Sequence, residues 1–455
     1  MPVKNGTAKF IVESIGRKVN IQAADVSKLK CFLLRCVLLA SQVPSSGLES
    51  TTMVLSLTCA VQNYDWGITG VSEVAELGER NTGNVSDQSK PHAELWLGTH
   101  PSGPSLVKAT GLGLKETIAE NVAEFLGDKT HARFGEDLPF LTKVLSVAKA
   151  LSIQAHPDKE LASKLHADRP NVYKDGNHKP EMTLAITEFE ALCGFVSGLA
   201  LAKNLQSVPE LRSTTGESVA AAFVSAVGTD DEKKALKDVF KAVMTASAEV
   251  VKTQIEELVN RLNGADETSL SAIDALALRL ESQYPNDVGV LCAYLLNYVV
   301  LSPGQCIFLA ANEPHAYLKG ECVECMATSD NVVRAGLTPK LRDTEILCDM
   351  LTYVAGEPTV LNGEIIPSGK STVKRYQPPF DEFQLETYDV PGGETCVAVP
   401  SPGPCVFLIQ KGSGEMNGDA IERGAVVFAK ASEEISIEAS EDVLVYRAMI
   451  NSRVF

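Results

Sequence analysis

The chain has 455 residues, of which 45% are hydrophobic and 22% charged, and its formal net charge is −17. This length and apolar content allow about two to four domains with buried cores, which excludes a disordered or fibrous protein. The acidic balance makes nucleic acid and anionic membrane surfaces poor partners. No apolar run reaches the ~18–20 residues of a membrane helix. The eleven cysteines are scattered over the chain, which favours reduced thiols in a cytoplasmic protein.

The first 52 residues differ in composition from the rest of the chain. They hold seven Lys or Arg against three acidic residues, with an apolar run at 31–40 and a Ser/Pro-rich end. A secretory signal places its apolar core within the first ~15–30 residues, so this run lies too far along the chain. We expect residues 1–52 to be an N-terminal extension that is disordered or absent from the mature protein: a targeting extension, or a stretch upstream of a true start near Met53. A folded element is the equal alternative.

Short β-type runs separated by turns fill residues 53–196, and a helical segment follows at 197–285. Thr229 to Glu232 has the form of a capping box, which predicts a helix start there. Apolar residues then recur at helical spacing. They are Leu236, Val239, Phe240, Val243 and Met244, followed by Ile255, Leu258, Val259 and Leu262. From about 302 onward, short strands with Gly/Pro turns return, which is typical of a sandwich or jelly roll.

Four metal-capable side chains stand at the ends of predicted strands. Gln154 and His156 alternate within "LSIQAHPDK", Glu181 follows "NHKP", and His315 lies in "NEPHAYL". Two imidazoles, one carboxylate and one amide oxygen suit zinc or another first-row divalent ion. The pair Cys322 and Cys325 has no second pair to complete a zinc tetrad, so we expect core thiols there.

Three basic residues accompany these motifs: Lys143, Lys179 and Arg334. Lys179 precedes Glu181 by two residues, which places both on one face of an extended segment. A divalent ion surrounded by such cations suits a sugar phosphate, because the metal polarises oxygens on carbon while the cations hold the phosphate.

The motifs resemble those of one family, the type I mannose-6-phosphate isomerases. The resemblance rests on "VQNYDWG", "AELWLGTHPSGPS", "LSIQAHPDK", "KPEM" and "NEPHAYLKGECVECMATSDNVVRAGLTPK", in this order, and runs from about 53 to the C-terminus. It implies a zinc enzyme that interconverts mannose 6-phosphate and fructose 6-phosphate and so supplies GDP-mannose synthesis and glycosylation. The implied fold is mainly β: a cupin-type catalytic domain (53–196 and 286–350), a helical insertion (197–285) and a C-terminal jelly roll (351–455).

The resemblance also implies roles for individual residues. One Zn²⁺ per chain would be held by Gln154, His156, Glu181 and His315, and the active-site arginine would be Arg334. Ser152, Lys143, Lys179 and Glu324 would line the pocket as substrate-binding or acid/base candidates. The expected partner is the sugar phosphate alone, with no nucleic acid and no membrane, and the expected state is a monomer.

The residues leave the proton carrier and the function class open. A metal-bound water, Glu324 or Lys179 could carry the proton between C1 and C2 of a cis-enediol. Arg334 is a poor base, since its guanidinium stays protonated, and could stabilise the enediolate or clamp the phosphate. Two His and one carboxylate also suit an Fe(II) oxygenase, although Gln154 as a fourth ligand leaves fewer free positions. A non-catalytic sugar-binding cupin is the remaining alternative.

Overall fold

The structure is a computed structural model, which describes residues 10–14, 17–21 and 54–455. The chain forms two compact units, 1–51 and 52–455. In the first unit, β1 (Phe10–Ser14) and β2 (Arg17–Ile21) form an antiparallel pair. The rest of the predicted extension, including the apolar run at 31–40, lies outside the described residues.

The largest sheet of the second unit has eleven strands, and β15 is its centre. Its strands are β4 (Ala60–Gln62), β7 (Glu94–Leu97), β9 (Phe140–Val147), β10 (Ile153–Ala155), β11 (Glu181–Ala185), β12 (Phe189–Phe195), β13 (Leu296–Leu301), β14 (Cys306–Leu309), β15 (His315–Ala327), β16 (Val333–Gly336) and β17 (Val360–Leu361). The long β15 pairs antiparallel with β9, β10, β11 and β12. Side chains from four distant segments are thereby brought to one strand.

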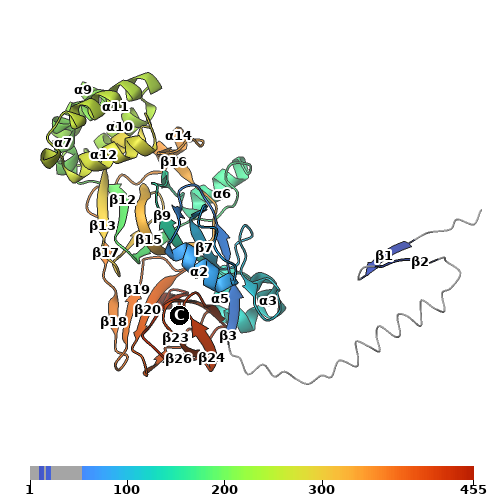
Figure 1. Cartoon of the computed structure of the whole chain (residues 1–455). Coiled ribbons are helices and arrows are strands. Elements are labelled where there is room, and N and C mark those ends of the chain that lie inside the picture. Colours follow the sequence, from blue (N-terminus) through green and yellow to red (C-terminus); the bar gives the residue numbers. More distant parts are fainter. Residues whose placement is uncertain (1–9, 15–16, 22–53) are drawn as a thin grey trace, which may run out of the picture. The chain divides into compact units, whose positions relative to one another are not determined.

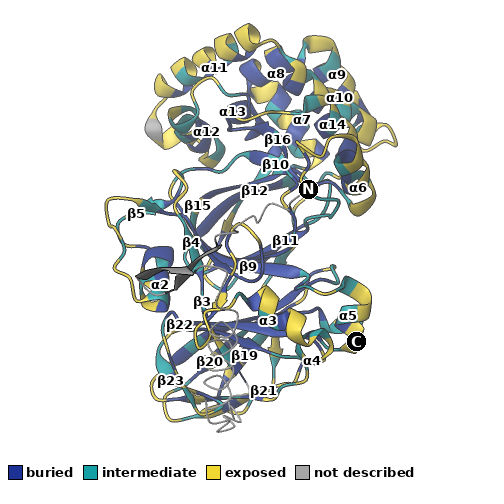
Figure 2. Cartoon of the chain, turned by 90° about the vertical axis from the view of Figure 1, so that its right-hand side faces the viewer, coloured by how far each residue is buried: buried dark blue, intermediate teal, exposed yellow. Residues whose placement is uncertain are grey.

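A helical segment follows β12 in the chain and lies at one end of the unit (Figure 1). It consists of α7 (Gly198–Ser207), α8 (Pro209–Thr215), α9 (Glu217–Ala226), α10 (Glu232–Thr245), α11 (Ala248–Asn263), the 3-10 turn Glu267–Ser269 and α12 (Ala272–Gln283). The apolar residues predicted to recur at helical spacing are buried in one core, with Val259 partly buried against it. Exposed residues lie on the outward faces of these helices, while the strands are largely buried (Figure 2).

The predicted capping box at Thr229 is wrong. Helix α10 begins at Glu232 without a side-chain cap. The Thr229 hydroxyl donates to the carbonyl of Ala226 at 2.7 Å, and the Glu232 carboxylate accepts from the amide of Gly228 at 2.6 Å. Both side chains therefore stabilise the preceding turn. Helix α12 does start with a capping box, formed by Ser271 and Asp274.

The C-terminal strands form a sandwich of two sheets. The eight-stranded sheet has the order β18 (Glu364–Ile366), β19 (Thr372–Tyr376), β20 (Gln384–Val390), β27 (Val443–Met449), β22 (Cys405–Lys411), β25 (Val426–Ala429), β3 (Val54–Thr58) and β8 (Leu106–Val107). The four-stranded sheet has the order β21 (Thr395–Ala398), β26 (Ile435–Ala439), β23 (Ser413–Met416) and β24 (Asp419–Glu422). The two sheets enclose one apolar core.

The eight-stranded sheet is a shared layer, because its other face packs on the eleven-stranded sheet. Residues of β27 alternate between the two cores. Val443 and Val445 face the core of the C-terminal sandwich, whereas Tyr446 and Ala448 pack against the eleven-stranded sheet. This alternation is what a strand with both faces buried requires.

Shorter elements complete the unit. The small pair is β5 (Ile68–Thr69) with β6 (Pro91–His92). The remaining helices are α2 (Glu73–Thr82), α3 (Leu114–Glu120), α4 (Val122–Leu126), α5 (Asp128–Phe134), α6 (Lys159–Asp168), α13 (Gly289–Cys292), α14 (Thr344–Met350) and the 3-10 turn Ser452–Val454. Among the described residues, no helix has the length and apolar character needed to cross a membrane.

The mainly β fold with a helical insertion is confirmed. The predicted boundaries at 53–196, 286–350, 197–285 and 351–455 remain predictions. Strand β3, which lies within residues 53–196, pairs with β25 of the C-terminal segment. Strand β17, which lies beyond residue 350, pairs with β14 of the eleven-stranded sheet. The sheets therefore exchange strands across the predicted boundary at 350.

Candidate active site

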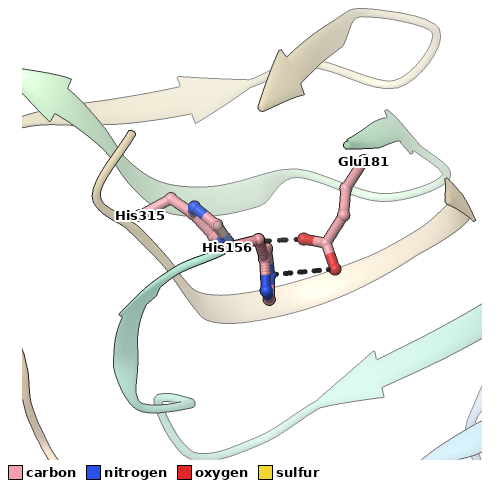
Figure 3. Close-up of side chains that lie close together, drawn as sticks. All are labelled: His156, Glu181 and His315. Carbon is pink, nitrogen blue, oxygen red and sulfur yellow. Dashed lines mark ion pairs between the residues drawn. The ribbon is translucent and has the colours of Figure 1, made fainter. Parts of the chain in front are cut away.

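Three of the predicted metal ligands converge at one point, which Figure 3 shows in close-up. His156 follows β10, Glu181 opens β11 and His315 opens β15. The Nε2 atoms of the two histidines lie 3.3 Å from the two carboxylate oxygens of Glu181, one on each. Each of the three residues is only 1% exposed. Their candidate ligand atoms all lie within 4.8 Å of one another.

Hydrogen bonds on the far side of each ring fix how the two imidazoles face this point. The Nδ1 atom of His156 lies 2.6 Å from the carbonyl oxygen of Asn331, and that of His315 lies 3.0 Å from the carbonyl oxygen of Glu313. A carbonyl only accepts, so each Nδ1 carries the proton and each Nε2 presents its lone pair. Both Nε2 atoms and one oxygen of Glu181 have no hydrogen-bond partner. Buried donors and acceptors seldom stay unpaired, so these atoms fit a metal ion.

The protonation states of these groups also suit a metal ion. Burial would raise the pKa of Glu181, but Lys179 and His156 hold it well below its usual value. Burial lowers the pKa of His156 to about 4. An ionised carboxylate beside the neutral imidazole of His156 is the state that metal binding requires.

Strand register places Gln154 and Arg334 beside this centre. In β10, Gln154 is paired with His315 of β15 on one side and with Arg334 of β16 on the other. The Gln154 Oε1 atom accepts a hydrogen bond from the Ser152 hydroxyl at 3.3 Å. These residues therefore meet through backbone pairing.

The two predicted lysines sit against carboxylates. Lys143 is paired in register with Glu324 across β9 and β15, and its Nζ lies 3.0 Å from the Glu324 carboxylate and 3.6 Å from that of Glu94. Burial would lower the pKa of Lys143, but these carboxylates raise it above its usual value. Burial raises the pKa of Glu324. The Nζ of Lys179 lies 3.2 Å from Glu181, in agreement with the predicted shared face.

A cavity of about 730 Å³ opens beside Glu181, one of the three converging candidate ligands. Seven of the predicted site residues line it: Lys143, Ser152, Gln154, Lys179, Glu181, Glu324 and Arg334. Arg334 forms no ion pair with any residue that the structure describes, and burial lowers its pKa. Its charge is therefore available to a ligand in the cavity. His156 and His315 are not among the lining residues.

Several residues at the site were not predicted. His100 and Asp330 line the cavity and form an ion pair across 3.3 Å, and the Nζ of Lys149 lies 4.2 Å from the ring centre of Tyr284. Asn331 contributes only a backbone carbonyl, for which a sequence carries no side-chain signal. His100 and Asp330 lie within two of the motifs that carry the resemblance, but nothing in the sequence marked either side chain as part of the site.

The cysteine pair at 322 and 325 is not a metal site. Cys322 and Cys325 are buried free thiols in different apolar cores. Burial raises the pKa of both, which keeps them protonated. The expectation of core thiols is confirmed.

Two family descriptions match this chain. The catalytic domain of type I phosphomannose isomerase matches residues 54–197, and its helical insertion domain matches residues 212–296. Mannose-6-phosphate isomerase 1 of Arabidopsis thaliana is 46% identical in an alignment of 409 residues that covers 87% of this chain and 94% of that protein. The mannose-6-phosphate isomerase of Schizosaccharomyces pombe is 42% identical over 86% of this chain and 98% of its own length.

Solved structures show the same likeness. A crystal structure of a mutant phosphomannose isomerase from Salmonella typhimurium superimposes with a TM-score of 0.75 at 28% identity, over 88% of this chain and 100% of that one. A structure of mannose 6-phosphate isomerase bound with zinc and yttrium gives the same TM-score, 0.75, identity, 28%, and coverage, 88% of this chain and 100% of that one.

Proposed function

Because this chain belongs to the type I phosphomannose isomerase family, and is therefore an isomerase, we propose that it interconverts mannose 6-phosphate and fructose 6-phosphate through a cis-enediol. The observation that carries the proposal is the convergence of His156, Glu181 and His315 beside a cavity that Lys143, Lys179 and Arg334 line. The related enzymes named above carry out an isomerisation of mannose 6-phosphate according to their names.

We propose that the metal is one zinc ion, held by Gln154, His156, Glu181 and His315. Imidazole nitrogen and carboxylate oxygen are common zinc ligands, and an amide oxygen is compatible with the set. When bound, the ion would supply Lewis-acid polarisation of the oxygens on C1 and C2. A related isomerase has been solved with zinc bound.

The cations of the cavity have separate tasks in this proposal. Arg334, which has no carboxylate partner among the described residues, stabilises negative charge on the phosphate or on the enediolate. Lys143 stays charged, because its carboxylate neighbours raise its pKa, and it therefore orients Glu324 or hydrogen-bonds the substrate. Ser152, through its hydrogen bond to Gln154, holds that amide in place.

The reaction moves one proton from C2 to C1 and one from the C2 hydroxyl to the C1 oxygen, and it needs no oxidant. Glu324 is a candidate for the proton carrier, because burial raises its pKa toward the range in which a carboxyl both accepts and donates. Lys179 is the second candidate, and its contact with Glu181 places it beside the metal-binding point. Variants at the two positions separate them through their pH–rate profiles.

We further propose that the chain works as a cytoplasmic monomer that supplies mannose 6-phosphate for GDP-mannose synthesis and glycosylation. The nine cysteines of the described segments are all free thiols, as in a reducing compartment. Light scattering of the purified chain tests the monomer.

A coupled assay tests the proposed reaction. Fructose 6-phosphate formed from mannose 6-phosphate is followed with the purified chain, with the same chain after chelation, and after zinc is restored. The proposal requires activity that chelation removes and zinc restores. If the chain consumes oxygen when loaded with iron and does not isomerise the sugar, it is an oxygenase. If it binds the sugar phosphate without turnover, it is a binding protein.

A further inference from the structure

The interior of the C-terminal sandwich contains charged side chains where strand alternation otherwise places apolar ones. Along β27, Val443, Val445 and Met449 face the core between its two sheets, and Arg447 has the same parity. On the neighbouring β20, Glu386 is paired in register with Arg447. Both residues are buried. A buried charge is costly unless it is paired, so this cluster requires a reason.

The cluster contains two guanidinium groups for one carboxylate. Arg447 donates from Nη1 to Glu386 at 3.1 Å and to the Tyr388 hydroxyl at 3.0 Å, and its Nη2 lies 3.1 Å from the sulfur of Cys405. Arg375 donates from Nε to the other oxygen of Glu386 at 2.9 Å. Burial raises the pKa of Cys405, so its thiol stays neutral. The cluster therefore carries one positive charge in excess.

A cavity of about 320 Å³ adjoins the cluster, and we call it the sandwich pocket. Arg375, Glu386 and Tyr388 line it. The Arg375 side chain is 23% exposed, and its Nη1 donates no hydrogen bond to any described residue. Val397 and Val399 line the same pocket and are 54% and 58% exposed. The pocket thus offers a free guanidinium edge and apolar side chains to one ligand. Its volume is at the lower end for small-molecule sites.

We propose that the sandwich pocket binds a small organic anion. Its carboxylate or phosphate group pairs with Arg375, and its apolar part contacts Val397 and Val399. The planar guanidinium suits both headgroups, because two parallel N–H groups can meet two oxygens. The bound anion neutralises the excess charge of the cluster. The active-site cavity is lined by different residues, so this site stands or falls independently of the isomerase proposal.

Equilibrium dialysis of the full chain against labelled phosphate and labelled butyrate at millimolar concentration tests the site. The matched variants are Arg375→Gln and Lys370→Gln, the second removing an exposed cation that pairs with Glu394 outside the pocket lining. We expect wild type and Lys370→Gln to bind one more anion per chain than Arg375→Gln. A difference with phosphate alone identifies a phosphate ligand, and one with butyrate alone identifies a carboxylate ligand.

A second variant keeps the test valid if Arg375→Gln fails to fold. Val397→Asp adds a carboxylate at an exposed position of the pocket and leaves the buried cluster intact. It is expected to lose the same single anion, with circular dichroism and the melting temperature showing a folded chain. The proposal is overturned if the folded variants bind both anions as wild type does, or if Lys370→Gln loses as much as they do.

Discussion

The eleven-stranded sheet and the C-terminal sandwich both bury ionisable side chains, but these side chains are paired with one another in different ways. In the sandwich, Arg447 and Glu386 bond directly to each other. Where the candidate metal ligands converge, by contrast, the Nε2 atoms of His156 and His315 face Glu181 without a hydrogen-bond partner. Removing one partner of a buried ion pair destabilises the fold, whereas converging unpaired atoms mark the place of a ligand. The predictions below test this contrast.

The largest effect is expected at Glu181. Glu181→Gln removes the only carboxylate among the three converging residues, so we expect loss of bound zinc and at least about a 10³-fold fall in isomerase rate, since metal polarisation supplies several kcal/mol. Metal analysis by mass spectrometry and the coupled assay measure both. Glu188→Gln, at an exposed position just beyond β11, is the control and should retain metal and rate. Full zinc in Glu181→Gln would contradict the site.

The matching change in the sandwich should affect stability instead. Glu386→Gln leaves Arg447 buried without its carboxylate, so we expect the free energy of unfolding to fall by about 3–5 kcal/mol. Urea unfolding measures the loss, and the folded fraction should keep its zinc. Glu438→Gln, on an exposed position of β26, should change stability by less than about 0.5 kcal/mol. Equal stability of the two variants would show that the buried pair contributes little.

Arg334→Ala should reduce turnover far more than zinc content. Removing a preorganised cation from the developing charge is expected to lower the rate about 10²- to 10³-fold, while the three converging ligands remain in place. The coupled assay and metal analysis are run on the same preparation. A parallel loss of zinc and rate would assign Arg334 a structural role.

Asp175 should affect zinc affinity without contacting the metal, because it holds the loop that orients His156. Its carboxylate accepts from the Ser329 hydroxyl at 2.8 Å and from the amide of Asp330 at 2.8 Å, which holds the loop whose Asn331 carbonyl orients His156. We expect Asp175→Asn to weaken zinc affinity about 10-fold, as for other groups that orient a ligand.

Competition with a chelating dye measures the zinc affinity of Asp175→Asn. Asp168→Asn, at an exposed position near the end of α6, is its control. Unchanged zinc affinity in Asp175→Asn would show that the loop holds its shape without this carboxylate.

Acid should weaken the two regions in different pH ranges. Burial lowers the pKa of His156 from 6.5 to about 4, so the unfolded chain takes up the proton first and stability of the metal-free protein falls as pH drops from 6.5 toward 4. Burial would raise the pKa of Glu386, but Arg447, Tyr388 and Arg375 together hold it below its usual value. The stability that Glu386 contributes is therefore lost only as the pH falls below the ordinary carboxyl range of about 4.3.

The pH prediction is tested on chelated protein. Between pH 7 and 5.5, wild type should lose about 1 kcal/mol more than His156→Gln in urea unfolding. Identical pH dependence of the two chains would show that His156 is not buried in its neutral form.

The sequence predicted the mainly β fold, the helical insertion and the convergence of His156, Glu181 and His315 on one point. The prediction of this convergence rested on motif resemblance, because the helical segment separates Glu181 from His315 in the sequence and their spacing does not show that they are close in space. In the structure, strand pairing accounts for one side of the site, because it brings Gln154 beside His315 and Arg334.

Other features could not be predicted from local pattern. Thr229 does not cap α10, because its hydroxyl donates to the Ala226 carbonyl and accepts from the Asp231 amide in the turn before the helix. Strand β3 joins the C-terminal sheet through pairing with β25, which depends on contacts hundreds of residues apart. The buried Arg447 breaks the apolar alternation of β27, and only its partners in space explain it.

Anomalous diffraction at the zinc edge, from crystals of the zinc-loaded chain, tests the central claim most directly. The account predicts one strong peak within bonding distance of the Nε2 atoms of His156 and His315 and of the Glu181 carboxylate. A peak elsewhere, or none at this point in a fully active preparation, would contradict it.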